Sequence, residues 1–113
     1  MVLLFNGVQI VDTITFKCIA TKESDLNTAY WDHETEEMGI FAIADVSCMS
    51  NKDMSHELSC DLSCEQLRDD DIEDDVVCAI KLFNLYKKMT GDGFTYWSVY
   101  VEGYCRSETD YYI

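Results

Sequence analysis

The chain has 113 residues, of which 48% are apolar, and 22 acidic residues against 8 basic ones give a formal net charge of −14. This length and apolar content are typical of one domain with a small core. Phosphate binding requires a basic surface, so the charge excludes nucleic acid as an expected partner. The same charge opposes approach to anionic bacterial cell walls at low salt.

Residues 1–15 are predicted to form an atypical N-terminal segment before one domain over residues 16–113. Polar residues interrupt the apolar start of this segment at Asn6, Gln9 and Asp12. No basic stretch precedes it, so it makes a poor signal peptide, and it is too short and too polar to span a membrane.

A helix is predicted where Phe16, Ile19, Ala20 and Glu23 recur at the spacing of one helical face. Glu23 closes this apolar face. A carboxyl held there is desolvated, which raises its pKa and suits it to general acid catalysis. An ordinary exposed glutamate at the end of a helix is the alternative.

Residues 29–47 predict a short β region, with a polar, turn-rich part at 30–35 and an apolar part at 39–46. Residues 48–67 then predict a loop with short helical turns. Further on, the aromatic residues 94–103 predict a short helix near the end of the chain.

A second long helix is predicted from Asp74 to about Lys88, and the Thr-Gly-Asp-Gly sequence of residues 90–93 ends it. Three apolar side chains repeat on one face of this helix: Val76, Ile80 and Phe83.

The start of that helix is the most acidic part of the chain. Six of the seven residues from 69 to 75 carry carboxylates: Asp69, Asp70, Asp71, Glu73, Asp74 and Asp75. Such a cluster repels itself unless a cation neutralises it, and calcium accepts carboxylate and carbonyl oxygens together. The alternative is a solvated helix cap, which the macrodipole favours. Cysteines at both ends, Cys64 and Cys78, favour the metal because a solvated cap needs no such clamp.

Six cysteines in so short a chain predict a disulfide framework and an oxidising compartment. They are Cys18, Cys48, Cys60, Cys64, Cys78 and Cys105. The sequence leaves their pairing open. A zinc site fits poorly, because only two of them lie close together along the chain.

Three pieces of the chain, in this order, resemble the C-type lysozyme/α-lactalbumin family, including its calcium-binding members. They are the segment Cys18–Thr28, the stretch Gly39–Ile43, and the spacing Cys48-x11-Cys60-x3-Cys64-x13-Cys78. The resemblance covers about residues 16–105. It implies an α+β fold with two lobes, mainly helical with a small β lobe. It also implies three bridges, which are Cys18–Cys105, Cys48–Cys64 and Cys60–Cys78. Neither cysteine of the family's usual fourth bridge is present in this sequence, and residues 1–15 do not resemble the family's first helix, so we expect either a paired loss or a chain cut short at both ends.

The resemblance implies that Glu23 is the acid of a glycosidase and that Glu37 is its nucleophile or stabilising carboxylate. The family's lysozymes have aspartate at the second position, and the extra methylene of glutamate displaces the charge. Strand alternation points the neighbouring Glu36 to the other face. The alternative is that Glu34, Glu36 and Glu37 form a solvated polar turn.

The expected sugar-binding strand departs from the family pattern. Ala42 and Ala44 stand where the family usually has amide side chains, and no aromatic residue precedes Cys48. Losing these contacts weakens sugar binding. Trp97 and Tyr100 occupy aromatic positions that resemble substrate-binding ones, but core packing is the favoured interpretation of both.

The resemblance also implies a calcium site. Its expected ligands are the side chains of Asp69, Asp74 and Asp75 with the backbone carbonyls of Gln66 and Asp71. The two histidines, His33 and His56, are expected at the surface.

We therefore predict a secreted, monomeric, calcium-binding protein that cleaves β-1,4 links of peptidoglycan weakly. Its partner is then an oligosaccharide or bacterial cell-wall glycan, and no membrane is involved. The alternative is a non-catalytic binding or regulatory protein like α-lactalbumin, with a protein partner that the sequence does not identify. Secretion is expected from the cysteines and the resemblance, not from a leader.

Overall fold

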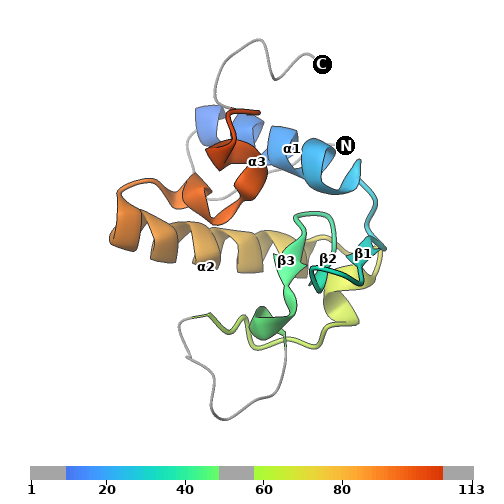
Figure 1. The fold of residues 1–113 in the computed structure, drawn as a ribbon. Helices are drawn as coiled ribbons and strands as arrows, with labels where there is room; N and C mark the ends of the chain where they lie inside the picture. Colours follow the sequence, from blue (N-terminus) through green and yellow to red (C-terminus); the bar gives the residue numbers. More distant parts are fainter. Residues whose placement is uncertain (1–9, 49–57, 106–113) are drawn as a thin grey trace.

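The structure, a computed structural model, describes residues 10–48 and 58–105. Its helices are α1 (Ile10–Ser24), α2 (Glu73–Thr90) and α3 (Ser98–Val101), and its strands are β1 (Trp31–Asp32), β2 (Glu37–Met38) and β3 (Ile43–Ala44) (Figure 1). Three single 3-10 turns are η1 (Asp45–Ser47), η2 (Gln66–Arg68) and η3 (Gly93–Tyr96).

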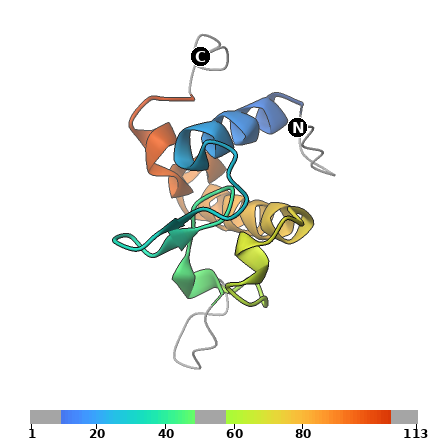
Figure 2. The ribbon, with the colours of Figure 1, turned by 90° about the vertical axis from the view of Figure 1, so that its right-hand side faces the viewer.

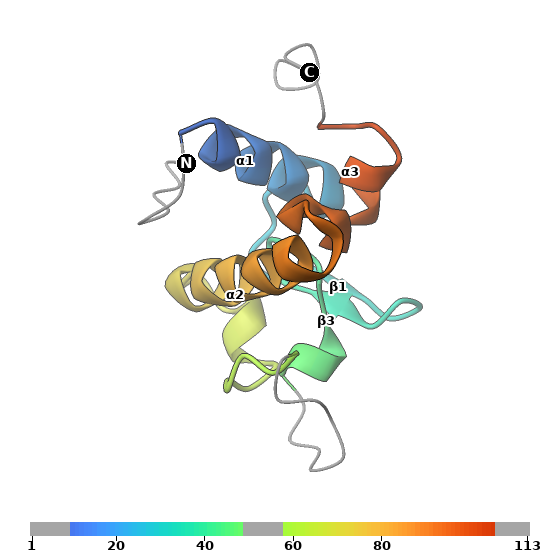
Figure 3. The ribbon, with the colours of Figure 1, turned by 90° about the vertical axis from the view of Figure 1, so that its left-hand side faces the viewer.

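The three strands form one antiparallel sheet in the order β1-β2-β3. Helices α1 and α3 lie on one side of α2, and η1 and η2 lie on the other (Figures 2 and 3). This arrangement confirms the predicted α+β class with a small sheet. Among the described residues, no helix is both long and apolar enough to cross a membrane.

Phe16 of α1 is at the centre of the core and is fully buried. Its ring lies 6.0 Å from that of Phe41, 5.5 Å from Phe83, 4.9 Å from Phe94 and 5.6 Å from Trp97, measured between centroids. Burying one such side chain contributes about 1.5–3 kcal/mol. The predicted apolar face of the first helix is confirmed, since Ile19 and Ala20 are also fully buried.

The first helix begins at Ile10, inside the segment 1–15 that the sequence sets apart. It ends in two left-handed residues, Asp25 with φ 55° and Leu26 with φ 61°. Their amides bind the carbonyls of Thr21 and Ala20, which closes the last turn.

The predicted extent of the second helix is confirmed, and so is its predicted face in part, since Phe83 is buried and both Val76 and Ile80 pack against the core. Five residues of α2 are buried: Asp75, Cys78, Ala79, Leu82 and Phe83. Val76 and Ile80 are only half-buried at the edge of the core. Asp75 and Cys78 are buried as well, so the buried face of α2 is centred on them more than on Val76 and Ile80. Gly91 ends the helix with φ 88°, as the Thr-Gly-Asp-Gly sequence predicts.

Two further predictions need correction. The apolar residues 39–46 do not form one strand. Only residues 43 and 44 pair, because left-handed Gly39 (φ 80°) and Ala42 (φ 48°) bend the chain into a turn. The predicted helix over residues 94–103 is broken at Trp97, whose backbone is extended.

The three disulfides match the pairing that the resemblance implies. Their Cα–Cα distances are 5.7 Å for Cys18–Cys105, 4.9 Å for Cys48–Cys64 and 5.3 Å for Cys60–Cys78. No cysteine is free. The first bridge ties α1 to the region after α3, and the other two tie the loop before α2 to η1 and to α2. Part of the predicted loop, residues 49–57 with His56, lies outside the described residues.

Candidate functional site

Glu23 lies half-buried in the last turn of α1. Burial raises the pKa of its carboxyl to about 7, and the negative charges of Glu37 and Glu102 raise it further. The backbone N–H of Val99, in α3, donates to this carboxylate and partly offsets the shift. A carboxyl with a pKa near 7 is about half protonated at pH 7 and mostly protonated below it, which suits a general acid.

Glu37 lies half-buried in β2, opposite Ala44 of β3. The structure thus brings the two carboxylates predicted to act together within electrostatic reach of each other, from a helix and a strand. Both groups sit at element ends, where the surrounding packing fixes their backbones.

Glu36 lies in the turn before β2 and not within a strand, so the strand alternation used to predict its orientation does not apply to it. It precedes β2 with φ 57° and is exposed. Glu34 is also exposed, and its amide donates to Oδ1 of Asp32 at 2.9 Å within a tight turn. These two glutamates therefore belong to the solvated turn that the sequence offered as the alternative, whereas Glu37 does not.

Two tyrosines flank the carboxylate pair, and sequence reasoning missed both. The charges of Glu23 and Glu37 raise the pKa of Tyr30, after burial and the charge of Asp32. Burial raises the pKa of Tyr96 to about 12, again with contributions from both glutamates. The amide N–H of Ala44 donates to the Tyr96 hydroxyl at 3.0 Å. No spacing in the sequence signals this contact, which joins residues 52 positions apart.

Trp97 and Tyr100 are held by packing. Trp97 is 2% exposed, and its indole N–H donates to the carbonyl of Phe41 at 2.8 Å. The Tyr100 hydroxyl donates to Oδ2 of Asp92 at 2.7 Å, and its ring packs against Phe94. The buried indole face offers no surface on which a sugar ring stacks.

The acidic region is anchored by one buried carboxylate. Asp75 is 1% exposed, and its Oδ1 has no hydrogen-bond partner in the part of the chain that the structure describes. Burial raises its pKa to about 7, and the charges of Asp69 and Asp74 raise it further. Its own backbone N–H and that of Ile40 donate to the carboxylate and lower it.

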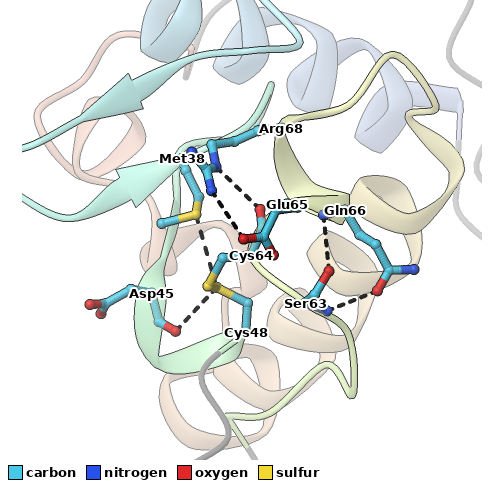
Figure 4. A network of polar contacts seen from close by, with 8 residues as sticks. All are labelled: Met38, Asp45, Cys48, Ser63, Cys64, Glu65, Gln66 and Arg68. Carbon is cyan, nitrogen blue, oxygen red and sulfur yellow. Dashed lines mark hydrogen bonds and ion pairs between the residues drawn. A yellow bond between two sulfur atoms is a disulfide. The ribbon is translucent and has the colours of Figure 1, made fainter.

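Of the other expected ligands, Asp69 and Asp74 lie within electrostatic reach of this carboxylate. Asp69 and Asp71 are exposed, and Oδ1 of Asp69 accepts the amide of Asp71 at 3.1 Å. Gln66 lies three residues after Ser63, and the backbone N–H of Ser63 donates to the side-chain oxygen of Gln66 at 2.8 Å (Figure 4). Within residues 10–48 and 58–105, no three histidine, cysteine or acidic side chains are gathered closely enough to hold a metal ion.

The chemistry of the donor set nevertheless fits calcium. All the expected ligands supply oxygen, which is the donor that calcium prefers. A buried carboxylate oxygen without a partner is rare in folded proteins and calls for an ion or a water molecule. Asp75 Oδ1 is such an atom.

The acidic region also contacts the sheet. Arg68 donates from Nε to the Cys64 carbonyl at 3.4 Å, and its guanidinium lies 4.1 Å from the ring centroid of Trp31 in β1. The sulfur of Met38 in β2 lies 3.9 Å from the Cys48 sulfur (Figure 4). His33 is exposed, as expected, and stacks on Trp31.

A backbone contact joins the acidic region to the turn after Glu37. Gly39 packs so closely against Asp75 and Leu67 that an added Cβ would overlap the Asp75 carboxylate and the Leu67 carbonyl. Its left-handed backbone also favours glycine.

Comparison with known proteins places these features in one family. The model of the C-type lysozyme/alpha-lactalbumin family matches residues 3–112. The chain is 31% identical over 78 residues to alpha-lactalbumin of Papio cynocephalus, which covers 68% of this chain and 58% of that protein. It is 31% identical over 112 residues to alpha-lactalbumin of Tachyglossus aculeatus aculeatus, covering 94% and 82%.

A solved lysozyme from Litopenaeus vannamei has the same fold, with a TM-score of 0.75 at 25% identity over 93% of this chain and 81% of that one. The chain spans only 58% and 51% of the first two curated relatives that it matches.

Proposed function

The chain belongs to the C-type lysozyme/α-lactalbumin family, and from this premise we propose that it is a secreted, calcium-binding glycoside hydrolase of weak activity. Its substrate class is the β-1,4-linked amino sugar chain of peptidoglycan, with Glu23 as general acid and Glu37 as nucleophile or stabilising carboxylate.

One observation carries this proposal, which is the pairing of a half-buried Glu23, whose pKa is raised to about 7, with Glu37. Retaining hydrolysis needs a neutral acid beside an ionised carboxylate, so that one donates a proton while the other stabilises the oxocarbenium-like state. Burial and the charge of Glu37 both raise the pKa of Glu23 to about 7. Lysozyme is itself the standard case of a glutamate tuned in this way, so the chemistry proposed here is that of the family.

Three features support weak activity. The extra methylene of Glu37 displaces its charge relative to aspartate, and misplacement on that scale costs roughly 100-fold in rate. The Tyr96 hydroxyl already accepts the hydrogen bond of the Ala44 amide, and Ala44 lies directly opposite Glu37 in the sheet. The net charge of −14 opposes approach to anionic walls.

For calcium, we propose the side chains of Asp69, Asp74 and Asp75 with the carbonyls of Gln66 and Asp71 as ligands. The buried, unpartnered oxygen of Asp75 supports this assignment. When bound, the ion neutralises the repelling carboxylates and so stabilises the fold. It has no part in the proposed hydrolysis.

The second candidate is a non-catalytic binding protein. The Tyr96–Ala44 hydrogen bond favours it, because a phenol that holds the backbone donor leaves less room for a sugar beside the carboxylate pair. Several relatives carry the name alpha-lactalbumin, among them those of Papio cynocephalus and Tachyglossus aculeatus aculeatus. No feature of the described surface identifies a partner protein.

Hydrolysis of a neutral chitooligosaccharide, run beside a cell-wall turbidity assay, separates the two candidates. Slow cleavage of the soluble substrate that Glu23→Gln abolishes supports the hydrolase. No cleavage at any enzyme concentration, with normal folding by circular dichroism, rejects it in favour of the binding protein. Cleavage of the soluble substrate without wall lysis isolates charge repulsion as the cause of the weakness.

A further inference from the structure

Two carboxylates that act together must be held at a fixed separation, although they lie on different elements. Glu23 is on α1 and Glu37 is on β2, and 13 residues of loop and strand separate them. Small displacements between such groups lower rates steeply. A buried side chain at the end of α1 bonds to the turn that follows β2.

Ser24, the residue after Glu23, is 5% exposed. Its hydroxyl lies 2.7 Å from the carbonyl oxygen of Ile40 and 2.9 Å from that of Ala20. The hydroxyl has a single hydrogen, and the shorter contact is the one that leaves the helix. Ser24 therefore ties the end of α1 to the turn that follows Glu37.

The same turn is held from the other side. The amide of Ile40 donates to the Asp75 carboxylate in α2, and the carbonyl of Phe41 accepts the Trp97 indole N–H. Val99, two residues after Trp97, donates its amide to Glu23. The turn and Glu23 are thus both fixed to the same α3 region, and Ser24 closes this set of contacts.

We propose that Ser24 is a positioning residue that sets the placement of Glu37 relative to Glu23, through its hydrogen bond to the Ile40 carbonyl. The inference rests on the proposed function for its catalytic meaning. The geometric part stands by itself, because the hydroxyl bridges the two elements whether or not the chain hydrolyses sugars.

The test is the titration of Glu23 followed by carboxyl carbon NMR, with the signal assigned by its absence in Glu23→Gln. The acidic groups that face Glu23 are Glu37, Glu102, Tyr30 and Tyr96. Tyr30 and Tyr96 also bond to residues next to the turn that Ser24 holds, through Gly39 and Ala44, but their raised pKa values keep both phenols neutral near pH 7. Glu37 is the carboxylate that lies next to this turn. Ser24→Ala should therefore move the Glu23 midpoint from about 7 toward the ordinary value of 4.5, because Glu37 moves away and water enters.

Thr21→Ala is the matched control. Thr21 lies on the same helix, and its hydroxyl also donates to the carbonyl four residues back, that of Lys17, at 2.9 Å. This bond stays within α1. Thr21→Ala should leave the Glu23 midpoint unchanged, and Ser24→Thr, which keeps the hydroxyl, should restore the wild-type midpoint.

A purely structural role for Ser24 would lower the melting temperature and leave the midpoint in place, which overturns the proposal. If Ser24→Ala does not fold alone, it is measured in an Asp25→Gly background, where glycine relieves the left-handed backbone at residue 25. A midpoint equal to that of Asp25→Gly then overturns the proposal equally.

Hydrolysis adds a second readout. Ser24→Ala should lower kcat on the chitooligosaccharide by roughly tenfold to 100-fold with little change in KM, since the substrate contacts are not removed. Absence of hydrolysis in the wild type rejects the proposed function, and the titration still decides the role of Ser24.

Discussion

The amide of Ala44 donates a 3.0 Å hydrogen bond to the hydroxyl of Tyr96, directly across the sheet from Glu37. The resemblance drew attention to Ala44 for the amide side chain that it lacks. The structure shows that its backbone donor is also engaged, by a phenol whose pKa responds to both Glu23 and Glu37. A side chain of the protein itself therefore already accepts the hydrogen bond of this backbone donor.

Removing Tyr96 should therefore open the site. Tyr96→Ala frees the Ala44 amide, and one recovered hydrogen bond of about 1.4 kcal/mol corresponds to a tenfold gain in affinity. We expect chitooligosaccharide binding, measured by calorimetry, to tighten by about that factor. Tyr86→Phe is the control, because Tyr86 packs on the Tyr96 ring at 5.2 Å and is not the acceptor of the Ala44 amide. Equal affinity in Tyr96→Ala and the wild type would show that the phenol does not obstruct sugar.

Substitutions of the two paired carboxylates should change the rate of hydrolysis in opposite directions. Glu23→Gln should abolish hydrolysis, because an amide cannot donate the required proton. Glu37→Asp should raise kcat, because it shortens the side chain to the length found in the family's lysozymes. Glu34→Asp, in the solvated turn, should have no effect. The assay is release of reducing sugar, and a fall in kcat for Glu37→Asp would contradict the assigned role.

Calcium should stabilise the fold. Because the ion binds the native state only, a calcium concentration of 100 times Kd adds about 2.7 kcal/mol. We expect the melting temperature to rise from EDTA to millimolar calcium, and Asp75→Asn to abolish most of this rise. Asp70→Asn should keep it, since Asp70 is exposed and hydrogen-bonded to Thr28 outside the expected ligand set. Identical melting curves in EDTA and in calcium would contradict the proposed calcium site.

Stability without calcium should fall as pH rises. Glu23 and Asp75 both have pKa values raised to about 7, from 4.5 and 3.8 respectively. Between the ordinary pKa values and pH 7, the folded state binds more protons than the unfolded state. The free energy of unfolding therefore decreases as the pH rises. Urea unfolding in EDTA should therefore give a lower midpoint at pH 8 than at pH 5. Glu23→Gln should flatten part of this slope, and a midpoint that rises over the same range would contradict both shifts.

The end of α1 offers a stabilising substitution. Asp25 has φ 55°, a conformation that costs most residues about 1 kcal/mol and glycine almost nothing. Asp25→Gly should raise the free energy of unfolding by several tenths of a kcal/mol or more, measured by urea titration. Asn27→Gly, two residues on, should lower it or leave it unchanged, because Asn27 has no left-handed backbone to relieve.

Patterns along the chain were enough to predict the two long helices and the small sheet. Spacings of three and four residues marked the buried face of α1, and the Thr-Gly-Asp-Gly sequence marked the end of α2. Resemblance supplied the disulfide pairing, which the structure matches. The face of α2 was predicted only in part, because apolarity pointed to Val76, Ile80 and Phe83 and gave no sign that the fold also buries the acidic Asp75.

The sequence by itself determined the family, the positions of both carboxylates and the acidic region, since these depend on residue type and local spacing. Only the tertiary structure decided what surrounds them. The Ser24–Ile40, Ala44–Tyr96 and Trp97–Phe41 hydrogen bonds join residues 16, 52 and 56 positions apart. Each uses a backbone group as partner, and a backbone group is the same at every residue. No pattern of side chains along the chain can therefore reveal which of them will meet.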